Sequence, residues 1–233
     1  MPLVFSPLSE DAITVPPRGL FPRHAFVMRQ IGSPPGIDRL MVDATVRILA
    51  ERDMQTKDAD DSSGSRDFLE RILGLIRGTG LTIAIFSNET RQTALANIML
   101  ELGFAAMCGK PLMIIKSRDA KAPSDLSRTD WIDFDPADVP AFDRKVRQAL
   151  DQIAQVADFE EDLLDIALQA DTMDCAIALE RAFKAFLLSG NQRLIEKAEI
   201  VKDRLIANRR IANISDLVRL SEEADLFIRL SRR

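Results

Sequence analysis

The stretch Leu81–Phe86, which reads Leu-Thr-Ile-Ala-Ile-Phe, decides the fold class. It is a continuous apolar run rich in β-branched residues. Turn residues bound it, with Gly78 and Gly80 before it and the polar loop from Ser87 to Gln92 after it. A short run of this kind predicts a strand with both faces buried, which is typical of the centre of a parallel sheet covered by helices.

Elements of two kinds alternate on either side of this strand. Apolar runs predict strands at Ala25–Met28 and Leu112–Ile115, and weaker signals predict strands near Met54 and at Trp131–Ile132. Segments with helical periodicity separate them. The alternation predicts an α/β fold: a doubly wound, flavodoxin-like parallel sheet of about five strands with helices on both faces. The expected helices cover residues 37–51 and 68–76, then one that ends near Cys108–Gly109 and one that begins near Pro140.

The pattern divides the chain into three parts. Residues 1–24 are rich in proline, which predicts an extended N-terminal arm. Residues 25–157 hold the alternating strands and helices. From Asp158 onward only helical periodicity remains, with a break at Ser189–Gly190–Asn191. We therefore expect residues 158–233 to form an all-helical extension that serves regulation or oligomerisation.

Composition excludes several classes of function. The chain of 233 residues is 46% hydrophobic and carries a net charge of −5, so no global basicity recruits nucleic acid or anionic membrane. The sequence has no apolar run of about 20 residues, the length that a membrane span needs. Cys108 and Cys175 lack any pairing or metal spacing, which indicates a soluble cytoplasmic protein. With His24 as its single histidine and no tyrosine, the chain is expected to use neither a histidine triad nor a metal.

One acidic residue stands out in an otherwise uncharged segment. Between Ala96 and Met107 the only charged residue is Glu101, and apolar residues surround it at every helical angle, so most faces of this helix are expected to be buried. Gly103 would permit close packing against a neighbour. Asn97 lies one turn before Glu101 on the same face. From the residues alone, Glu101 is either an exposed or capping residue or a carboxylate held for a function.

The same segment resembles a known motif. Asn97 to Ala105, Asn-Ile-Met-Leu-Glu-Leu-Gly-Phe-Ala, is followed by Gly109–Lys110–Pro111 and an apolar strand. This order is similar to the N-x-x-x-E-L-G-x-A…G-K-P pattern of the nucleoside 2-deoxyribosyltransferase-like and TIR-like nucleotide-binding proteins. The later loop Ala122–Leu126 resembles the proline and Asp-Leu loop of the TIR-like branch. The resemblance covers residues 25–157 and does not extend to the helical C-terminal part.

The resemblance implies a nucleophile and a binding crevice. Glu101 would attack the anomeric carbon of a nucleoside or nucleotide, displace the base and form a glycosyl ester, which water or another base then releases. Asn97 would orient Glu101 or a ribose hydroxyl. The loop from Arg29 to Gly36 would border the crevice at the carboxyl ends of the strands. The substrate-binding residues expected on this basis are Arg29, Gln30, Gly32, Ser87, Asn88, Lys116 and Asp125. Arg29 and Lys116 are the candidate phosphate contacts, with solvated surface charges as the alternative.

One departure from the pattern bears on the substrate. Relatives often carry an aspartate just before the central strand, where this chain has Gly78–Thr79–Gly80–Leu81. No acid can be assigned to protonate a leaving base, since Glu89, Asp119 and Asp125 all lie in predicted loops. Nicotinamide in NAD⁺ is already cationic at the scissile bond and leaves as a neutral molecule. The absence of an acid therefore favours NAD⁺, as substrate rather than cofactor, over a simple nucleoside.

The resulting expectation is an N-glycosidase that cleaves NAD⁺ or a related nucleotide, as a regulated toxic effector of prokaryotic antiviral defence. Two alternatives stay open: a non-catalytic protein that senses a nucleotide and binds a partner, and a nucleoside 2-deoxyribosyltransferase of salvage. We expect a homo-oligomer or a protein partner to engage residues 158–233 through two apolar rows. The rows are Ile177, Phe183, Phe186 and Leu187, then Leu217, Leu220, Phe227 and Leu230.

Overall fold

A five-stranded, all-parallel sheet forms the centre of the protein, as predicted. The computed structural model describes residues 4–5, 12–13, 19–59, 68–121, 131–169, 175–208 and 214–232. The strand order is β4-β3-β5-β6-β7, so that β5, the strand on which the prediction of the fold rests, is central. These strands are β3 (Phe21–Met28), β4 (Gln55–Lys57), β5 (Thr79–Phe86), β6 (Leu112–Ser117) and β7 (Trp131–Phe134).

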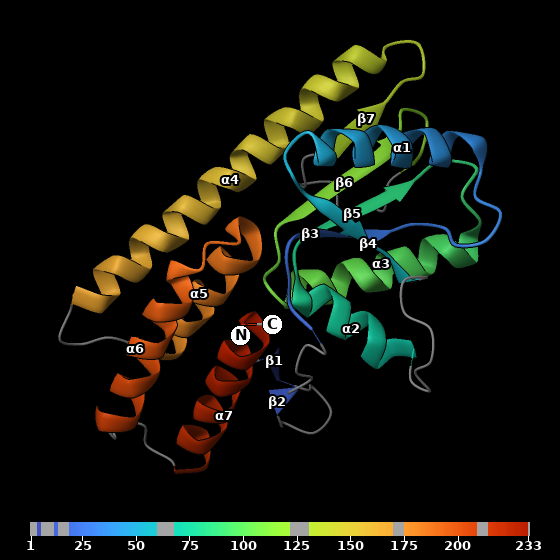
Figure 1. Ribbon diagram of the computed structural model, residues 1–233. Coiled ribbons are helices and arrows are strands. Elements are labelled where there is room, and N and C mark those ends of the chain that lie inside the picture. The colour runs from blue at the N-terminus through green and yellow to red at the C-terminus, as the bar shows by residue number, and fades with distance from the viewer. Residues whose placement is uncertain are drawn as a thin grey trace.

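Helices cover both faces of the sheet, which confirms the doubly wound architecture (Figure 1). Successive side chains of β5 point to opposite faces: Leu81, Ile83 and Ile85 pack in one core cluster, Ala84 and Phe86 in the other. The first cluster lies under α1 (Gly36–Ala50) and the first half of α4 (Val139–Gln169), the second under α2 (Phe68–Gly78) and α3 (Gln92–Met107). Three more helices follow, α5 (Cys175–Ser189), α6 (Arg193–Asn208) and α7 (Ile214–Ser231).

Two predicted boundaries differ from the structure. The expected arm was to end at residue 24, but β3 begins at Phe21, and a register shift between Phe21 and Ala25 accommodates Pro22 within the strand. Before it, β1 (Val4–Phe5) pairs with β2 (Ala12–Ile13) in an antiparallel ribbon. The expected domain boundary between residues 157 and 158 lies inside α4, which runs through it. The physical reason is that residues 141–169 contain neither glycine nor proline to end the helix at that point.

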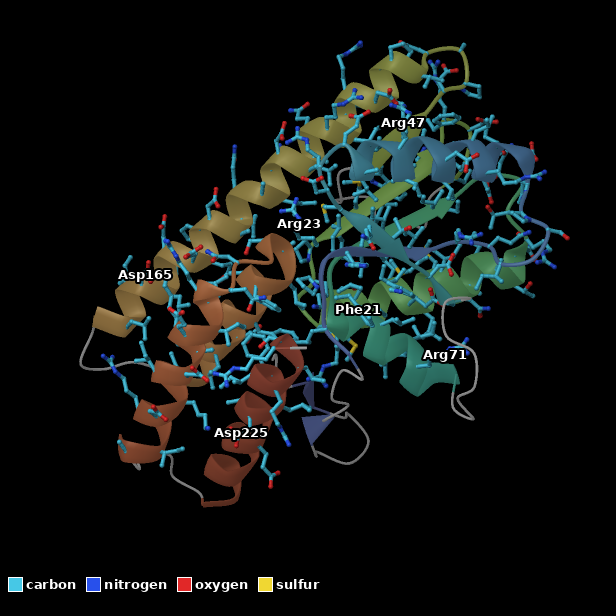
Figure 2. The ribbon with its side chains drawn as sticks, in the orientation of Figure 1. Phe21, Arg23, Arg47, Arg71, Asp165 and Asp225 are labelled. Carbon is cyan, nitrogen blue, oxygen red and sulfur yellow. The ribbon has the colours of Figure 1, made fainter. Side chains whose placement is uncertain are left out.

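Of the C-terminal helices, α5 packs against the amino ends of the central strands β3 and β5. A Cβ atom built on Gly80, near the start of β5, would lie 2.4 Å from the carbonyl oxygen of Leu187 in α5, so that only glycine permits this approach. Arg23 lies at the same junction (Figure 2) and donates hydrogen bonds to the carbonyls of Arg52 and Ser189, at the carboxyl ends of α1 and α5. The cation satisfies carbonyls that the helices leave unpaired.

The described members of the apolar rows predicted for the helical extension are mostly internal. Four of the five described members, Phe183, Phe186, Leu187 and Phe227, are at most 5% exposed and belong to one core cluster, whereas the fifth, Leu230, is partly exposed. The ring of Phe227 contacts those of Phe183 and Phe186 at centroid distances of 5.0 and 5.8 Å. The side chains of Ile177, Leu217 and Leu220 lie outside the described residues. These four described members therefore hold α5 and α7 together and present little surface to another chain.

Candidate functional site

The carboxyl edge of the sheet contains the switch point at which such folds bind ligands. After β3 the chain enters α1 on one face, and after the neighbouring β5 it enters α3 on the other face. The loops 29–35 and 87–91 therefore leave the sheet in opposite directions, at the place where open α/β sheets bind ligands. This arrangement places most of the predicted substrate-binding residues at the same edge.

A hydrogen-bond network joins the two loops. Gln30 is buried, its Oε1 accepts from the backbone N–H of Arg91 at 2.9 Å, and its Nε2 donates to the carbonyl of Ser33 at 2.9 Å. The guanidinium of Arg91 donates to the carbonyls of Ile31 and Gly32. Gly32 has a positive φ of 64°, a conformation that glycine adopts without strain. Gln30 and Gly32 thus join the two loops, and these hydrogen bonds occupy their polar groups.

Sequence reasoning missed the buried carboxylate of Asp38. Asp38 lies in the first turn of α1, is 1% exposed, and accepts a hydrogen bond from the Thr90 hydroxyl at 2.9 Å. Its other oxygen, Oδ1, has no partner among the described residues. An aspartate in a first turn is common because it complements the helix dipole, so no sequence pattern distinguishes Asp38 from an ordinary first-turn residue. Asp38 and Thr90 extend the polar network of Gln30 and Arg91 at the switch point.

Ser87 and Asn88 follow β5 directly but differ in what they offer a ligand. Ser87 is buried, its backbone N–H donates to the Thr90 hydroxyl at 2.8 Å, and its Oγ accepts from the N–H of Glu89 at 3.2 Å. Ser87 therefore closes the turn. The side chain of Asn88 is exposed and donates to Asp119 at 3.2 Å across the loop that follows β6. Of the two, Asn88 is the more accessible to a substrate.

The two predicted phosphate contacts each hold a carboxylate. Arg29 pairs with Asp58 at 2.5 Å, and Lys116 pairs with Asp133 at 2.6 Å. A phosphate at either site would have to compete with these ion pairs. Asp125 lies outside the described residues. A cavity of about 290 Å³ opens beyond β6 and β7 at the same edge, but its charged lining is mixed and favours no anion: Arg118, Lys145, Asp133, Asp135 and Asp138.

Glu101, the predicted nucleophile, is a partly buried carboxylate without a partner. Burial raises its pKa from 4.5 to about 7, because the charged form is poorly solvated there. No hydrogen bond or ion pair joins it to any other residue in the described part of the chain. Asn97, one turn earlier, is exposed. A desolvated and unpaired carboxylate is costly for the fold, which is typical of a group retained for chemistry.

The structure corrects two expectations for the helix that carries Glu101. Leu100 is 50% exposed and Met107 is 51% exposed, so the expected burial of most faces is wrong. Gly103 is exposed and no described atom lies within 4 Å of a Cβ built on it, so it packs against no other element in the described part of the chain. The reason is that α3 has a single neighbouring layer, the sheet, and its opposite side points away from it (Figure 1).

The structure does not join Glu101 to the carboxyl-edge network. Glu101 is the tenth residue of α3, which places it roughly 14 Å along the helix axis from Gln92. The described hydrogen bonds of Gln30 join the two loops, and the Thr90 hydroxyl bonds to Asp38 in α1; none of these bonds reaches Glu101. The predicted site therefore consists of two parts: a polar switch point at the carboxyl edge, and a carboxylate halfway along α3.

Comparisons with known proteins do not assign this chain to a family. No protein-family model matches it, and no curated protein matches it significantly. Within the described ranges, no group of three or more His, Cys, Asp or Glu side chains is placed to hold a metal ion. Nor does the described part of the chain contain a helix that is long and apolar enough to cross a membrane.

Proposed function

We propose that this protein is an N-glycosidase that cleaves the bond between base and ribose in NAD⁺ or a related nucleotide, with Glu101 as the nucleophile. The observation that carries the proposal is the unpaired, partly buried Glu101 carboxylate, whose pKa is raised to about 7. The switch point between β3 and β5 supports it, since open α/β sheets bind nucleotides there. The resemblance of residues 97–105 and 109–111 to the deoxyribosyltransferase-like pattern supplies the reaction class.

The proposed chemistry needs one carboxylate and no acid for the leaving group. A carboxylate oxygen of Glu101 bonds to the anomeric carbon, the carbon–nitrogen bond breaks, and its electron pair neutralises the nicotinamide ring. Water then attacks the glycosyl ester, which releases ADP-ribose and a proton and restores the carboxylate. Because only the ionised form attacks, the rate is expected to rise with pH through about 7, the pKa of Glu101.

One observation favours a different function. Glu101 lies halfway along α3, whereas the polar loops of the switch point lie at the carboxyl edge. A nucleotide held by the loops would reach Glu101 only if it extended along α3. The second candidate is therefore a non-catalytic nucleotide sensor that binds its signal at the switch point. In either case the role we propose is a regulated effector of prokaryotic antiviral defence.

The experiment that separates these functions is incubation of purified protein with NAD⁺ and a panel of nucleosides, followed by chromatography of the products. An N-glycosidase releases nicotinamide, and Glu101→Gln lowers turnover by orders of magnitude, because the amide keeps the shape but cannot attack. Glu89→Gln is the matched control, since Glu89 is exposed in the turn after β5. Saturable NAD⁺ binding without turnover would replace the enzyme with the sensor, and base exchange between nucleosides would indicate the salvage transferase.

A further inference from the structure

Helix α3 has two apolar sides, and the structure covers one of them. Ile98, Leu102 and Ala105 are buried against the sheet. On the opposite side, Ala96, Leu100, Gly103 and Met107 are all exposed. Their spacing of four, three and four residues places them in one row along the outer side of the helix. We call these four residues the α3 seam.

The α3 seam is unusual for a surface helix because it carries no charge. From Gln92 to Met107 the helix has one ionisable residue, Glu101, which lies off the seam toward the buried side. Leu100 and Met107 are each about half exposed, at 50% and 51%. Helices that are apolar all round are normally covered on all sides. An uncharged seam also offers nothing that would attract a charged peptide, nucleic acid or anionic surface.

The order of large and small residues in the α3 seam fits a second copy of the same seam. In a two-fold antiparallel pairing centred between residues 101 and 102, Leu100 lies opposite Gly103 of the other chain, and Met107 lies opposite Ala96. Each large side chain thus meets a small residue, in both directions at once. Such self-complementarity is what a two-fold interface requires, and open space above Gly103 leaves room for the incoming leucine.

We propose that the protein forms a two-fold homodimer through antiparallel packing of the α3 seams. The inference does not depend on the proposed catalytic activity. A single helix pair buries less surface than a typical obligate dimer, so the assembly is expected to dissociate on dilution. Sedimentation velocity of the full chain over a range of about 1 to 200 μM spans the affinities expected of such contacts. We expect a monomer–dimer equilibrium within that range.

Two substitutions in the α3 seam disrupt the dimer while sparing the monomer. Gly103→Leu places a large side chain where the partner's Leu100 must enter, although within one chain no described atom lies within 4 Å of its Cβ. Leu100→Glu brings a charge into the apolar contact from a half-exposed position. Each is expected to weaken dimerisation roughly tenfold or more. Phe159→Glu is the matched control, since Phe159 is 59% exposed on α4, away from the α3 seam.

The register has its own test. Chains with Leu100→Cys and chains with Gly103→Cys, mixed and oxidised, are expected to form a disulfide-linked pair more readily than either alone. A protein that stays monomeric at 200 μM overturns the proposal. So does a dimer that both seam variants preserve; if Phe159→Glu abolishes that dimer, the interface belongs to α4. Cross-linking that is equal in the mixed and the separate samples rejects the antiparallel register.

Discussion

Replacing Glu101 with glutamine tests the desolvation of this carboxylate without any assumption about a substrate. Burial raises the pKa of Glu101 from 4.5 to about 7. A group whose pKa is higher in the folded state stabilises the fold below its unfolded pKa, and this contribution is lost as pH rises through the folded pKa. The cost of holding Glu101 ionised is thus absent near pH 4 and complete near pH 8. Glutamine has the same shape and no charge, so the variant does not bear this cost.

The magnitude follows from the size of the shift. One pKa unit corresponds to about 1.4 kcal/mol, so the full shift corresponds to roughly 3 kcal/mol. Because the carboxylate retains some contact with solvent, we discount this to about 2 kcal/mol. The free energy of unfolding of Glu101→Gln is therefore expected to equal that of the wild type near pH 4. Near pH 8 it is expected to exceed that of the wild type by about 2 kcal/mol.

Urea denaturation between pH 4 and 8.5 measures this difference, with the fluorescence of Trp131, the single tryptophan, as the probe. Glu89→Gln, in an exposed turn, controls for the loss of a carboxylate as such. The difference in unfolding free energy between this variant and the wild type should not change with pH. A difference for Glu101→Gln that is equally flat would refute the desolvation of Glu101. If Glu101→Gln is more stable than the wild type at pH 8 but has lost NAD⁺ turnover, the carboxylate is needed for activity and lowers the stability of the fold.

Three further predictions concern buried groups. Burial lowers the pKa of Lys110 from 10.5 to about 7. The free energy of unfolding of the wild type relative to Lys110→Met should therefore rise between pH 7 and 10, by up to about 1 kcal/mol per pH unit. A difference between the two proteins that does not change with pH in urea denaturation would contradict this. Gly80→Ala should cost several kcal/mol and speed hydrogen exchange in α5, because its Cβ would lie 2.4 Å from the Leu187 carbonyl oxygen. Gly103→Ala, in open space, serves as the control, and slow exchange in both variants would exclude the clash. Thr90→Val should destabilise the fold by about 2–3 kcal/mol because it strips the buried Asp38 carboxylate of its hydroxyl donor; a loss below about 0.5 kcal/mol in denaturation would show that Asp38 is otherwise satisfied.

The sheet was predictable because its strands carry an unambiguous signal. The run Leu81–Phe86 lies between two helical layers, so every residue must be apolar or small, and no helix of that length would be bounded by such turns. The end of a helix is harder to predict when nothing in the sequence stops it. The change of pattern at residue 158 reflects a change of neighbours, from the sheet to the other helices, while α4 itself continues. Periodicity reports which side of a helix is buried and not what buries it.

The candidate site was predictable only in part, for a related reason. Gln30, Ser87 and Asn88 follow apolar strands, so parallel pairing brings them to the same edge. The contact between Asp38 and Thr90 joins residues 52 positions apart, and no local pattern marks it. The exposure of the α3 seam could not be predicted either. An uncharged helix is expected to be buried, but its sequence does not show whether the chain itself or another molecule covers it.

The position of Lys110 shows where the C-terminal helices contact the motif segment that follows Glu101. Lys110 belongs to the Gly-Lys-Pro part of the motif, yet its ammonium donates to the carbonyls of Arg77 and Thr79 and lies 5.3 Å from the ring centre of Phe183 in α5. It therefore joins the end of α3 to the helical extension and does not face the carboxyl edge. The same helix α5 also approaches β5 at Gly80 and β3 at Arg23. The helical extension therefore contacts both the segment that carries Glu101 and the two strands that lead to the switch point.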